Sequence, residues 1–195
     1  MPLRRETSPL HAVPSLDAPE DRACVAAIAR GDRAAFETLY RRYYERLFRF
    51  ALRVNGRIAG VDDIVAETLI VVWRNAGEYR ATSAVSTWIF GIAYRKALKA
   101  LARERRASAP LEESIEPVEL SAADQVDADS VRAAIVRAIA GLPPEHRAVV
   151  ELTFHFNRSY QDIAEILDCP VGTVKSRMFH ARAKLRPLLA HLLGD

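Results

Sequence analysis

The sequence lacks the residues and segments that mark secreted, metal-binding and membrane-spanning proteins. Only two of its 195 residues are cysteines, and Cys24 and Cys169 lie far apart along the chain, so neither a disulfide framework nor a metal-ligand pair is indicated. No apolar run approaches the roughly 18 residues that a membrane-spanning helix needs. Residues 1–20 contain no apolar segment of the kind found in a secretory signal. These absences predict a protein of the reducing cytoplasm.

Motifs that support catalysis are missing as well. The chain has 8 glycines but no glycine-rich phosphate loop, and it contains neither an HExxH zinc motif nor a GxSxG nucleophile turn. Its histidines show no ligand spacing with cysteines or carboxylates. The carboxylate pair Asp62 and Asp63 stands where a helix is expected to begin, and a capping role explains it. We therefore predict no catalytic residue, no metal and no cofactor.

Apolar residues recur at steps of three and four along most of the chain, which is the spacing of helices with one buried face. In the segment that follows Asp32, a suitable N-cap, the stripe comprises Phe36, Leu39, Tyr40, Tyr43, Leu47, Phe50, Ala51 and Val54. No alternating pattern of the kind that predicts β-strands is present. We therefore predict an all-α fold. The expected helices are residues 21–30, 32–54, 62–73, 87–106, 131–140, 144–155, 160–167 and 171–186.

Charge and proline content divide the chain into two domains, a tail and a linker. Residues 1–20 contain four prolines and are expected to be disordered. Residues 107–130 hold seven acidic residues and no lysine or arginine, which predicts a flexible acidic linker. The two helical domains, residues 21–106 and 131–195, carry an excess of basic residues, which suits a polyanionic partner. The alternative is that arginine-rich helices merely have solvated faces.

The C-terminal domain contains the pattern of a helix-turn-helix. Ser159 and Asp162 have the spacing of a helix-capping box, the turn 168–170 follows, and the second helix is expected to stop near Pro187. Outside its apolar face this helix carries hydroxyls, cations and an imidazole but no acid. Such groups suit phosphates and base edges in a major groove, although an ordinary amphipathic helix with a solvated face is the alternative. The outward residues are Thr173, Lys175, Ser176, Arg177, His180, Arg182 and Lys184.

Aromatic residues lie close to cations around the last helix of the N-terminal domain. The aromatic residues are Tyr79, Trp88, Phe90 and Tyr94, and the cations are Arg95, Lys96, Lys99 and Arg103. Aromatic faces next to positive charge can stack unpaired bases and hold their backbone. The alternative is that Trp88 and Phe90 are core residues, and we favour it for Trp88 because this residue lies on the apolar stripe of its helix.

Distinct motifs occur in a fixed order along the two domains. In the N-terminal domain they are residues 36–40, 63–68, 72–74 and 86–93. In the C-terminal domain they are residues 141–147, residues 159–164 and the run Asp168-Cys169-Pro170-Val171-Gly172-Thr173-Val174-Lys175-Ser176-Arg177. This ordered set closely resembles the bacterial sigma factors of the extracytoplasmic-function (ECF) group, and the similarity covers about residues 22–190.

The resemblance implies a subunit, not an enzyme, that directs promoter-specific initiation by core RNA polymerase and takes no small-molecule substrate. It implies that the N-terminal domain binds the β′ clamp helices and melts the −10 element. The C-terminal domain would read the −35 element and meet the β flap, and an anti-sigma factor would restrain the protein. The implied polymerase contacts are Asp63, Glu67, Trp73 and Arg74. The implied −10 contacts are Tyr79, Ser83, Trp88, Arg95, Lys96, Lys99 and Arg103. The implied −35 contacts are Ser159, Tyr160, Thr173, Lys175, Ser176, Arg177, Phe179, His180 and Arg182.

Three departures from the family pattern and two rival interpretations accompany this prediction. Ala66 replaces a usual glutamine, Arg95 and Lys99 replace an asparagine and an aspartate, and His180 stands where an arginine is frequent. One rival is a helix-turn-helix regulator that binds duplex DNA alone, and the acidic start of the helix at 62–73 argues against it because acids suit a protein partner better than phosphate. The other is an RNA-binding or hydrolytic enzyme, which lacks a site motif.

Overall fold

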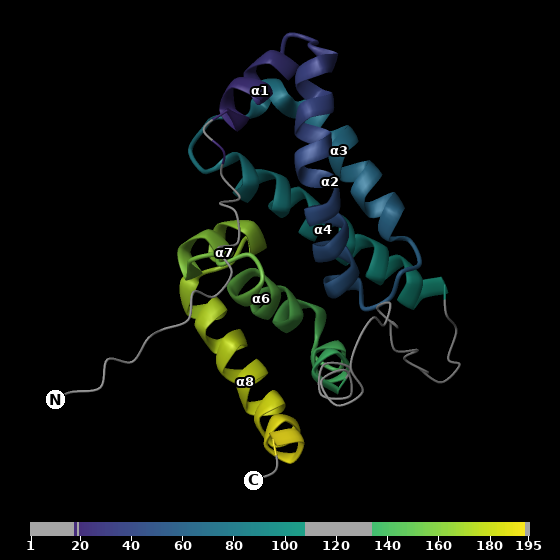
Figure 1. Ribbon diagram of the computed structural model, residues 1–195, viewed down its shortest axis with the longest axis vertical. Coiled ribbons are helices and arrows are strands. Elements are labelled where there is room, and N and C mark those ends of the chain that lie inside the picture. The colour runs from purple at the N-terminus through teal and green to yellow at the C-terminus, as the bar shows by residue number, and fades with distance from the viewer. Residues whose placement is uncertain (1–17, 19, 108–133, 194–195) are drawn as a thin grey trace, which may run out of the picture.

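The computed structural model describes residue 18, residues 20–107 and residues 134–193. Nearly all of the expected tail and linker lies outside this part of the chain. Every regular element described is helical and no strand occurs among these residues, which confirms the all-α prediction. The N-terminal elements are α1 (Asp21–Ile28), α2 (Arg33–Asn55), α3 (Val61–Asn75), the 3-10 turn η1 (Ala76–Glu78) and α4 (Val85–Ala107) (Figure 1). The C-terminal elements are a helical stretch at 134–140, α6 (Pro144–Phe154), α7 (Tyr160–Leu167) and α8 (Val171–Leu193).

Local capping residues set several helix ends at the expected places. The carboxylate of Asp32 accepts two backbone N–H hydrogen bonds, of 2.9 and 3.1 Å, and α2 begins there. Gly56 ends α2 with φ +82°, a left-handed conformation that favours glycine. Ser159 and Asp162 form a complete capping box at the start of α7, each side chain accepting the other residue's backbone N–H at 3.1 Å. The helix-turn-helix is therefore built from the signals that predicted it.

Most helix ends lie within two residues of the prediction, and the ends of α8 and α4 are the most informative differences. Helix α8 continues through Pro187 to Leu193, although an end near this proline was expected. A proline inside a helix costs about 3 kcal/mol, but the leucines and alanine that follow it are strong helix formers, so the helix resumes. Helix α4 begins at Val85, two residues before the expected start. Val85, Ser86 and Thr87 are buried in the interior and form the first turn of the helix.

The core of the N-terminal domain lies between α2, α3 and α4. Leu39, Tyr43, Leu47 and Phe50 of α2 are fully buried, as the periodicity predicted. Tyr40, expected in the same stripe, is 40% exposed, because it lies at the edge of the stripe and turns toward the outer side of α2. Only some of the aromatic side chains of α2 are therefore buried in the core, and the others reach the surface.

The short helix α1 is fixed to α2 by a buried carboxylate. Asp21, 1% exposed, accepts a hydrogen bond of 2.5 Å from the Tyr43 hydroxyl. It also accepts a hydrogen bond from the Arg42 guanidinium, which is the charge partner that a buried carboxylate requires. This cluster ties the start of the described chain to the middle of α2.

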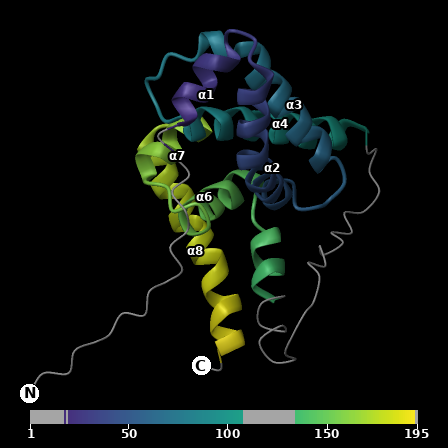
Figure 2. The same cartoon turned by 45° about the horizontal axis from the view of Figure 1, so that its top comes forward.

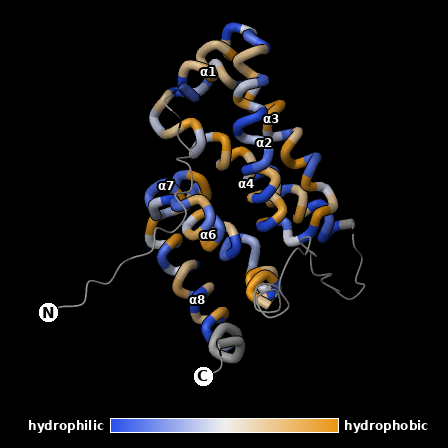
Figure 3. Tube along the Cα trace, in the orientation of Figure 1, coloured by the Kyte–Doolittle hydropathy of each residue, from blue (hydrophilic) through white to orange (hydrophobic). Residues whose placement is uncertain are grey.

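The helix-turn-helix domain packs against the N-terminal domain. Helices α6, α7 and α8 form one group, with α6 against α2 and α7 against α4, as the views in Figures 1 and 2 agree. Hydrophobic residues occur at intervals along α4, which packs against both α3 and α7 (Figure 3). The buried residues of both domains consequently form one continuous core.

Candidate polymerase and promoter interfaces

The outer face of α3 carries three of the four implied polymerase contacts. Asp63, Glu67 and Arg74 are exposed and share one side of the helix at steps of three and four. Ile70 lies in the same row and is 48% exposed, an apolar residue that the sequence analysis did not select. Trp73 points elsewhere: its ring packs edge-on against Phe36 of α2, with centroids 5.2 Å apart. The structure therefore joins three of the predicted residues into one face and separates the fourth.

A ladder of aromatic rings runs along α2 beside that face. Phe36, Tyr40, Tyr44 and Phe48 follow one another at four-residue steps, with centroid distances of 6.5, 5.2 and 6.3 Å. The Tyr44 hydroxyl donates a hydrogen bond of 3.0 Å to Asp62, and this bond raises the pKa of the phenol. The sequence analysis placed Phe36 and Tyr40 in the buried stripe and did not select Tyr44 or Phe48, because periodicity alone does not separate a buried edge from an exposed one.

One ion pair connects the α3 face to the cations of α4. The Lys96 ammonium lies 2.8 Å from the Glu67 carboxylate. This hydrogen bond and the charge of Lys96, with Lys99 and Arg103 adding to it, lower the pKa of Glu67. Glu67, an implied polymerase contact, and Lys96, an implied −10 contact, thus pair with each other. The other implied −10 cations of α4 remain exposed, namely Arg95, Lys99 and Arg103.

The loop before α4 and the start of α4 bring three implied −10 contacts together. The rings of Tyr79 and Trp88 lie 5.2 Å apart at 38°. The Tyr79 hydroxyl donates a hydrogen bond of 2.6 Å to the backbone carbonyl of Ser83, which closes the loop. Trp88 is half-buried and packs against the core, so it is neither a pure core residue nor a free surface ring. This pair of half-exposed rings is a surface on which an unpaired base can stack.

The exposed face of α8 has the chemistry of a major-groove helix. Val174, Met178 and Ala181 are buried, as predicted, and hold α8 against α6 and α7. The opposite side presents Lys175, Ser176, Phe179, His180 and Arg182, and the Phe179 ring is 69% exposed. Cations suit phosphates, and an exposed apolar ring suits a thymine methyl group.

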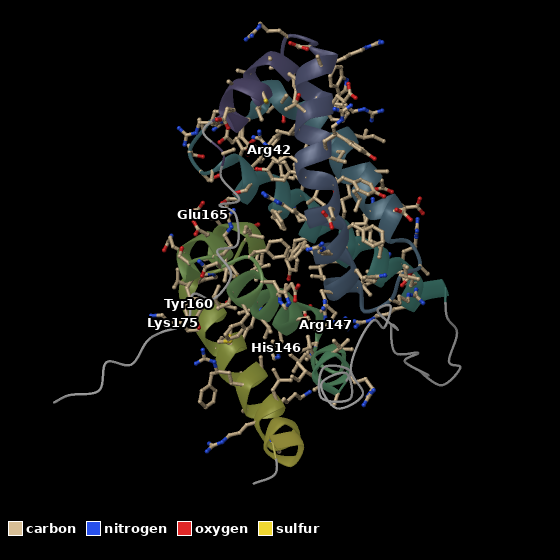
Figure 4. All side chains as sticks on the ribbon, viewed as in Figure 1. Arg42, His146, Arg147, Tyr160, Glu165 and Lys175 are labelled. Atoms are coloured by element: carbon tan, nitrogen blue, oxygen red, sulfur yellow. The ribbon has the colours of Figure 1, made fainter. Side chains whose placement is uncertain are left out.

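Three other implied −35 contacts are less accessible than the sequence suggested. Ser159 is exposed, but its hydroxyl is engaged in the capping box with Asp162. Thr173 and Tyr160 are half-buried, and the Thr173 carbonyl accepts a hydrogen bond of 3.0 Å from Ser176. Figure 4 labels Tyr160 and Lys175 on the side of the domain where α7 and α8 begin. Ser159 and Thr173 therefore take part in hydrogen bonds within the helix-turn-helix itself.

Arg177 does not lie on the open face where the sequence analysis placed it. Its side chain is half-buried, and one guanidinium nitrogen is 3.7 Å from the Cys169 sulfur. It also hydrogen-bonds Tyr94 of α4, whose pKa is raised to about 12 by burial, with Arg177 opposing the shift. A side chain assigned to the −35 element therefore contacts the other domain.

His180 is stacked on a second histidine at the start of α6. The rings of His146 and His180 are nearly parallel, at 12°, with centroids 6.2 Å apart. Burial lowers the pKa of His146, and the neighbouring His180 and Arg177 lower it further, while Glu145 opposes them. The contact between His146 and α8 was not predicted, because no spacing in the sequence links the two histidines.

Sequence relatives cover most of the chain. The "ECF RNA polymerase sigma factor SigM" of Mycobacterium tuberculosis is 36% identical over 173 residues, which is 88% of this chain and 86% of that protein. The chain belongs to the ECF group of RNA polymerase sigma factors. The "RNA polymerase sigma-H factor" of Pseudomonas aeruginosa is 29% identical over 187 residues, covering 90% of this ECF chain and 97% of that protein.

The regions of the ECF sigma factors map onto the two helical groups. The family Sigma-70 region 2 matches residues 39–107, and Sigma-70, region 4 matches residues 132–185. The exposed α3 face and the Tyr79–Trp88 pair lie within the first match, and α8 up to Leu185 lies within the second. Within the described residues, no helix is both long and apolar enough to cross a membrane.

Solved structures share the fold. The structure of CnrH in complex with the cytosolic domain of CnrY matches with a TM-score of 0.65 at 28% identity, covering 88% of this chain and 97% of that one. The sigma factor RpoE in complex with the anti-sigma factor NepR from Bartonella quintana matches with a TM-score of 0.59 at 25% identity, covering 79% of this chain and 96% of that one.

Proposed function

We propose that this ECF sigma factor recruits core RNA polymerase to a specific set of promoters and directs initiation there. The observation that carries the proposal is that one chain presents a mixed acidic and apolar face on α3 and an acid-free, cationic face on α8. The first suits a protein partner and the second suits DNA. A regulator that acts alone needs only the second face.

The division of labour between the domains is part of this proposal. Residues 21–106 bind polymerase and the −10 element, and residues 131–195 read the −35 element. The polymerase surface consists of Asp63, Glu67 and Arg74 with Ile70 at its centre, next to the aromatic ladder of α2. We assign it to the clamp helices of β′, and we assign the β flap to the C-terminal domain. The complex of RpoE with the anti-sigma factor NepR supports an anti-sigma factor as a further partner.

At the −10 element, the Tyr79–Trp88 pair stacks a base that has left the duplex. Unstacking one base step costs a few kcal/mol, and stacking on an aromatic ring returns about 1–3 kcal/mol per base. The exposed cations Arg95, Lys99 and Arg103 hold the adjacent phosphates. At the −35 element, Lys175 and Arg182 contact phosphates or base edges from either end of the exposed face of α8, with Phe179 between them.

The experiment is transcription in vitro with purified core polymerase, this protein and a library of promoter fragments, with start sites mapped. Discrete starts that share −35 and −10 elements support the proposal. The double variant Lys175→Ala/Arg182→Ala should abolish these starts, whereas replacement of Arg30, an exposed arginine just after α1, by alanine should not. Duplex binding without any initiation would identify the stand-alone regulator instead.

A further inference from the structure

On the basis of the proposed function, we infer that binding of the −35 element is coupled to the uptake of one proton by His180 of α8, and that His146 of α6 positions the ring which accepts this proton. Three features of the histidine pair support the coupling. They are the exposure of His180, the stacking of the two rings, and the burial of His146 among cations.

The imidazole of His180 lies on the face of α8 that is proposed to contact DNA. Its side chain is exposed, as are those of Ser176 and Lys184, each one helical turn away. Residues 171–193 contain no acidic residue, so His180 has no carboxylate on its own helix. A DNA phosphate is therefore the counter-charge that a protonated imidazole at this position requires.

Neighbouring rings restrict the orientation of the His180 imidazole. The ring of His146 is stacked on it at 12° with centroids 6.2 Å apart, and the ring of Phe179 meets it nearly edge-on, at 76° and 5.6 Å. Figure 4 labels His146 where the start of α6 lies beside α8. A side chain that is already oriented loses less conformational freedom when it binds a partner. His146 is thus a positioning residue for His180.

His146 itself stays neutral, so the pair accepts one proton and not two. Among the residues that the structure describes, its Nδ1 is buried and has no hydrogen-bond partner. An imidazolium carries a proton on both nitrogens, so a charged His146 would leave a buried N–H unpaired. Burial lowers the pKa of His146, and His180, Arg177 and Lys184 lower it further, against the opposing effect of Glu145. Of the two rings, His180 is therefore the one that accepts the proton.

The charged groups around the pair make the site cationic before the proton arrives. Glu145 of α6 is the one carboxylate among the groups that act on His146, and Arg177 and Lys184 of α8 are the cations. Tyr94 of α4 and Cys169, in the turn before α8, bear on Arg177 from behind. Imidazole is the side chain that ordinarily titrates between pH 5 and 8. A dependence on pH in this range therefore arises from the histidines.

The direction and size of the effect follow from proton linkage. A phosphate beside an imidazole favours its charged form, so the affinity for DNA rises as the pH falls, by at most tenfold per pH unit for one proton. For an imidazole with an ordinary pKa of about 6.5 that rises by about one unit next to phosphate, the affinity is about fivefold higher at pH 5.5 than at pH 7.5.

The experiment measures the affinity of the full chain for duplex DNA by fluorescence anisotropy between pH 5.5 and 7.5 at constant ionic strength. The probe is a fragment with the mapped −35 element or, if no start is mapped, a fragment selected from the same library by binding. His180→Gln cannot charge and His180→Arg is always charged. His146→Phe keeps a ring that cannot titrate, whereas His146→Ala removes the ring. His155→Gln is the matched control, since His155 also lies at an end of α6 and its side chain is exposed.

We expect about a fivefold gain in affinity at pH 5.5 for the wild type, His155→Gln and His146→Phe. His180→Gln should bind weakly at both pH values, and His180→Arg should bind at pH 7.5 about as tightly as the wild type does at pH 5.5. His146→Ala should reduce the gain to about twofold or less. Circular dichroism at each pH confirms that every variant is folded.

Three results would overturn the inference. One is equal wild-type affinity at pH 5.5 and 7.5. Another is a gain that persists in His180→Gln or is lost in His146→Phe, because the proton would then bind elsewhere. The third is a full gain in His146→Ala, because the stacked ring would then position nothing. Failure of the proposed function is distinguishable, since it appears as absent initiation while binding of the selected duplex still depends on pH.

Discussion

The buried carboxylate that anchors α1 offers a sharp test of the energetics of region 2. Replacing Asp21 with Asn keeps the shape of the side chain but removes the charge that pairs with Arg42 and receives the Tyr43 hydroxyl. Removal of one partner from a buried ion pair costs about 3–5 kcal/mol. Arg42 is 27% exposed and regains some hydration, and Asn still accepts from Tyr43, so we expect a loss of about 2–3 kcal/mol.

Tryptophan fluorescence is a suitable assay because both tryptophans, Trp73 and Trp88, lie in region 2. With a urea m value of about 2 kcal/mol per molar, the midpoint of Asp21→Asn should fall by about 1–1.5 M. Glu37→Gln is the control, since Glu37 pairs with Arg41 at the surface, where such pairs contribute at most about 0.5 kcal/mol. Equal midpoints for the two variants would refute the reasoning, because they would mean that burial gives the Asp21 pair no added weight.

Three further predictions concern region 4 and its contact with α4. Ser159→Ala should destabilise region 4 by about 1 kcal/mol in a thermal melt followed by circular dichroism, because it removes the cap of α7. Burial lowers the pKa of His146, so the unfolded chain binds more protons and stability should fall as pH drops below about 6.5; His146→Gln should flatten that slope in urea titrations. Burial raises the pKa of the Tyr94 phenol to about 12, so the free energy of unfolding should fall as pH rises from about 10 towards 12. The difference in tyrosinate absorbance between wild type and Tyr94→Phe should titrate near the upper end of this range.

Features controlled by neighbouring residues were predictable from the sequence. The N-cap at Asp32 and the capping box at Ser159 depend on residues two or three positions away, and both occur as expected. The buried face of α8 followed from steps of three and four. The continuation of this helix through Pro187 was missed because a local rule about proline was given more weight than the helix formers that follow it.

Features that depend on distant residues could not be predicted. Tyr40 was assigned to the core because the edge of a buried stripe depends on the neighbouring helix, which the sequence does not locate. The ion pair between Glu67 and Lys96 joins residues 29 positions apart on two helices. The position of Arg177 depends on the docking of one domain on the other. In each case the sequence identified the face of the helix on which the residue lies. It did not identify the partner that the residue contacts on another helix.

The position of Arg177 links the fold to the proposed function. A guanidinium that reads a guanine needs its donors directed at the base edge, in bidentate geometry. In this structure the guanidinium instead faces the Cys169 sulfur and the Tyr94 phenol. Because the same donors cannot serve both arrangements, Arg177 must leave these partners before it reads a base. We expect Arg177→Ala to lose about 1–3 kcal/mol at one −35 position. A duplex-binding assay on fragments that differ at single −35 base pairs measures this loss. An equal loss on every sequence would instead identify Arg177 as a phosphate contact.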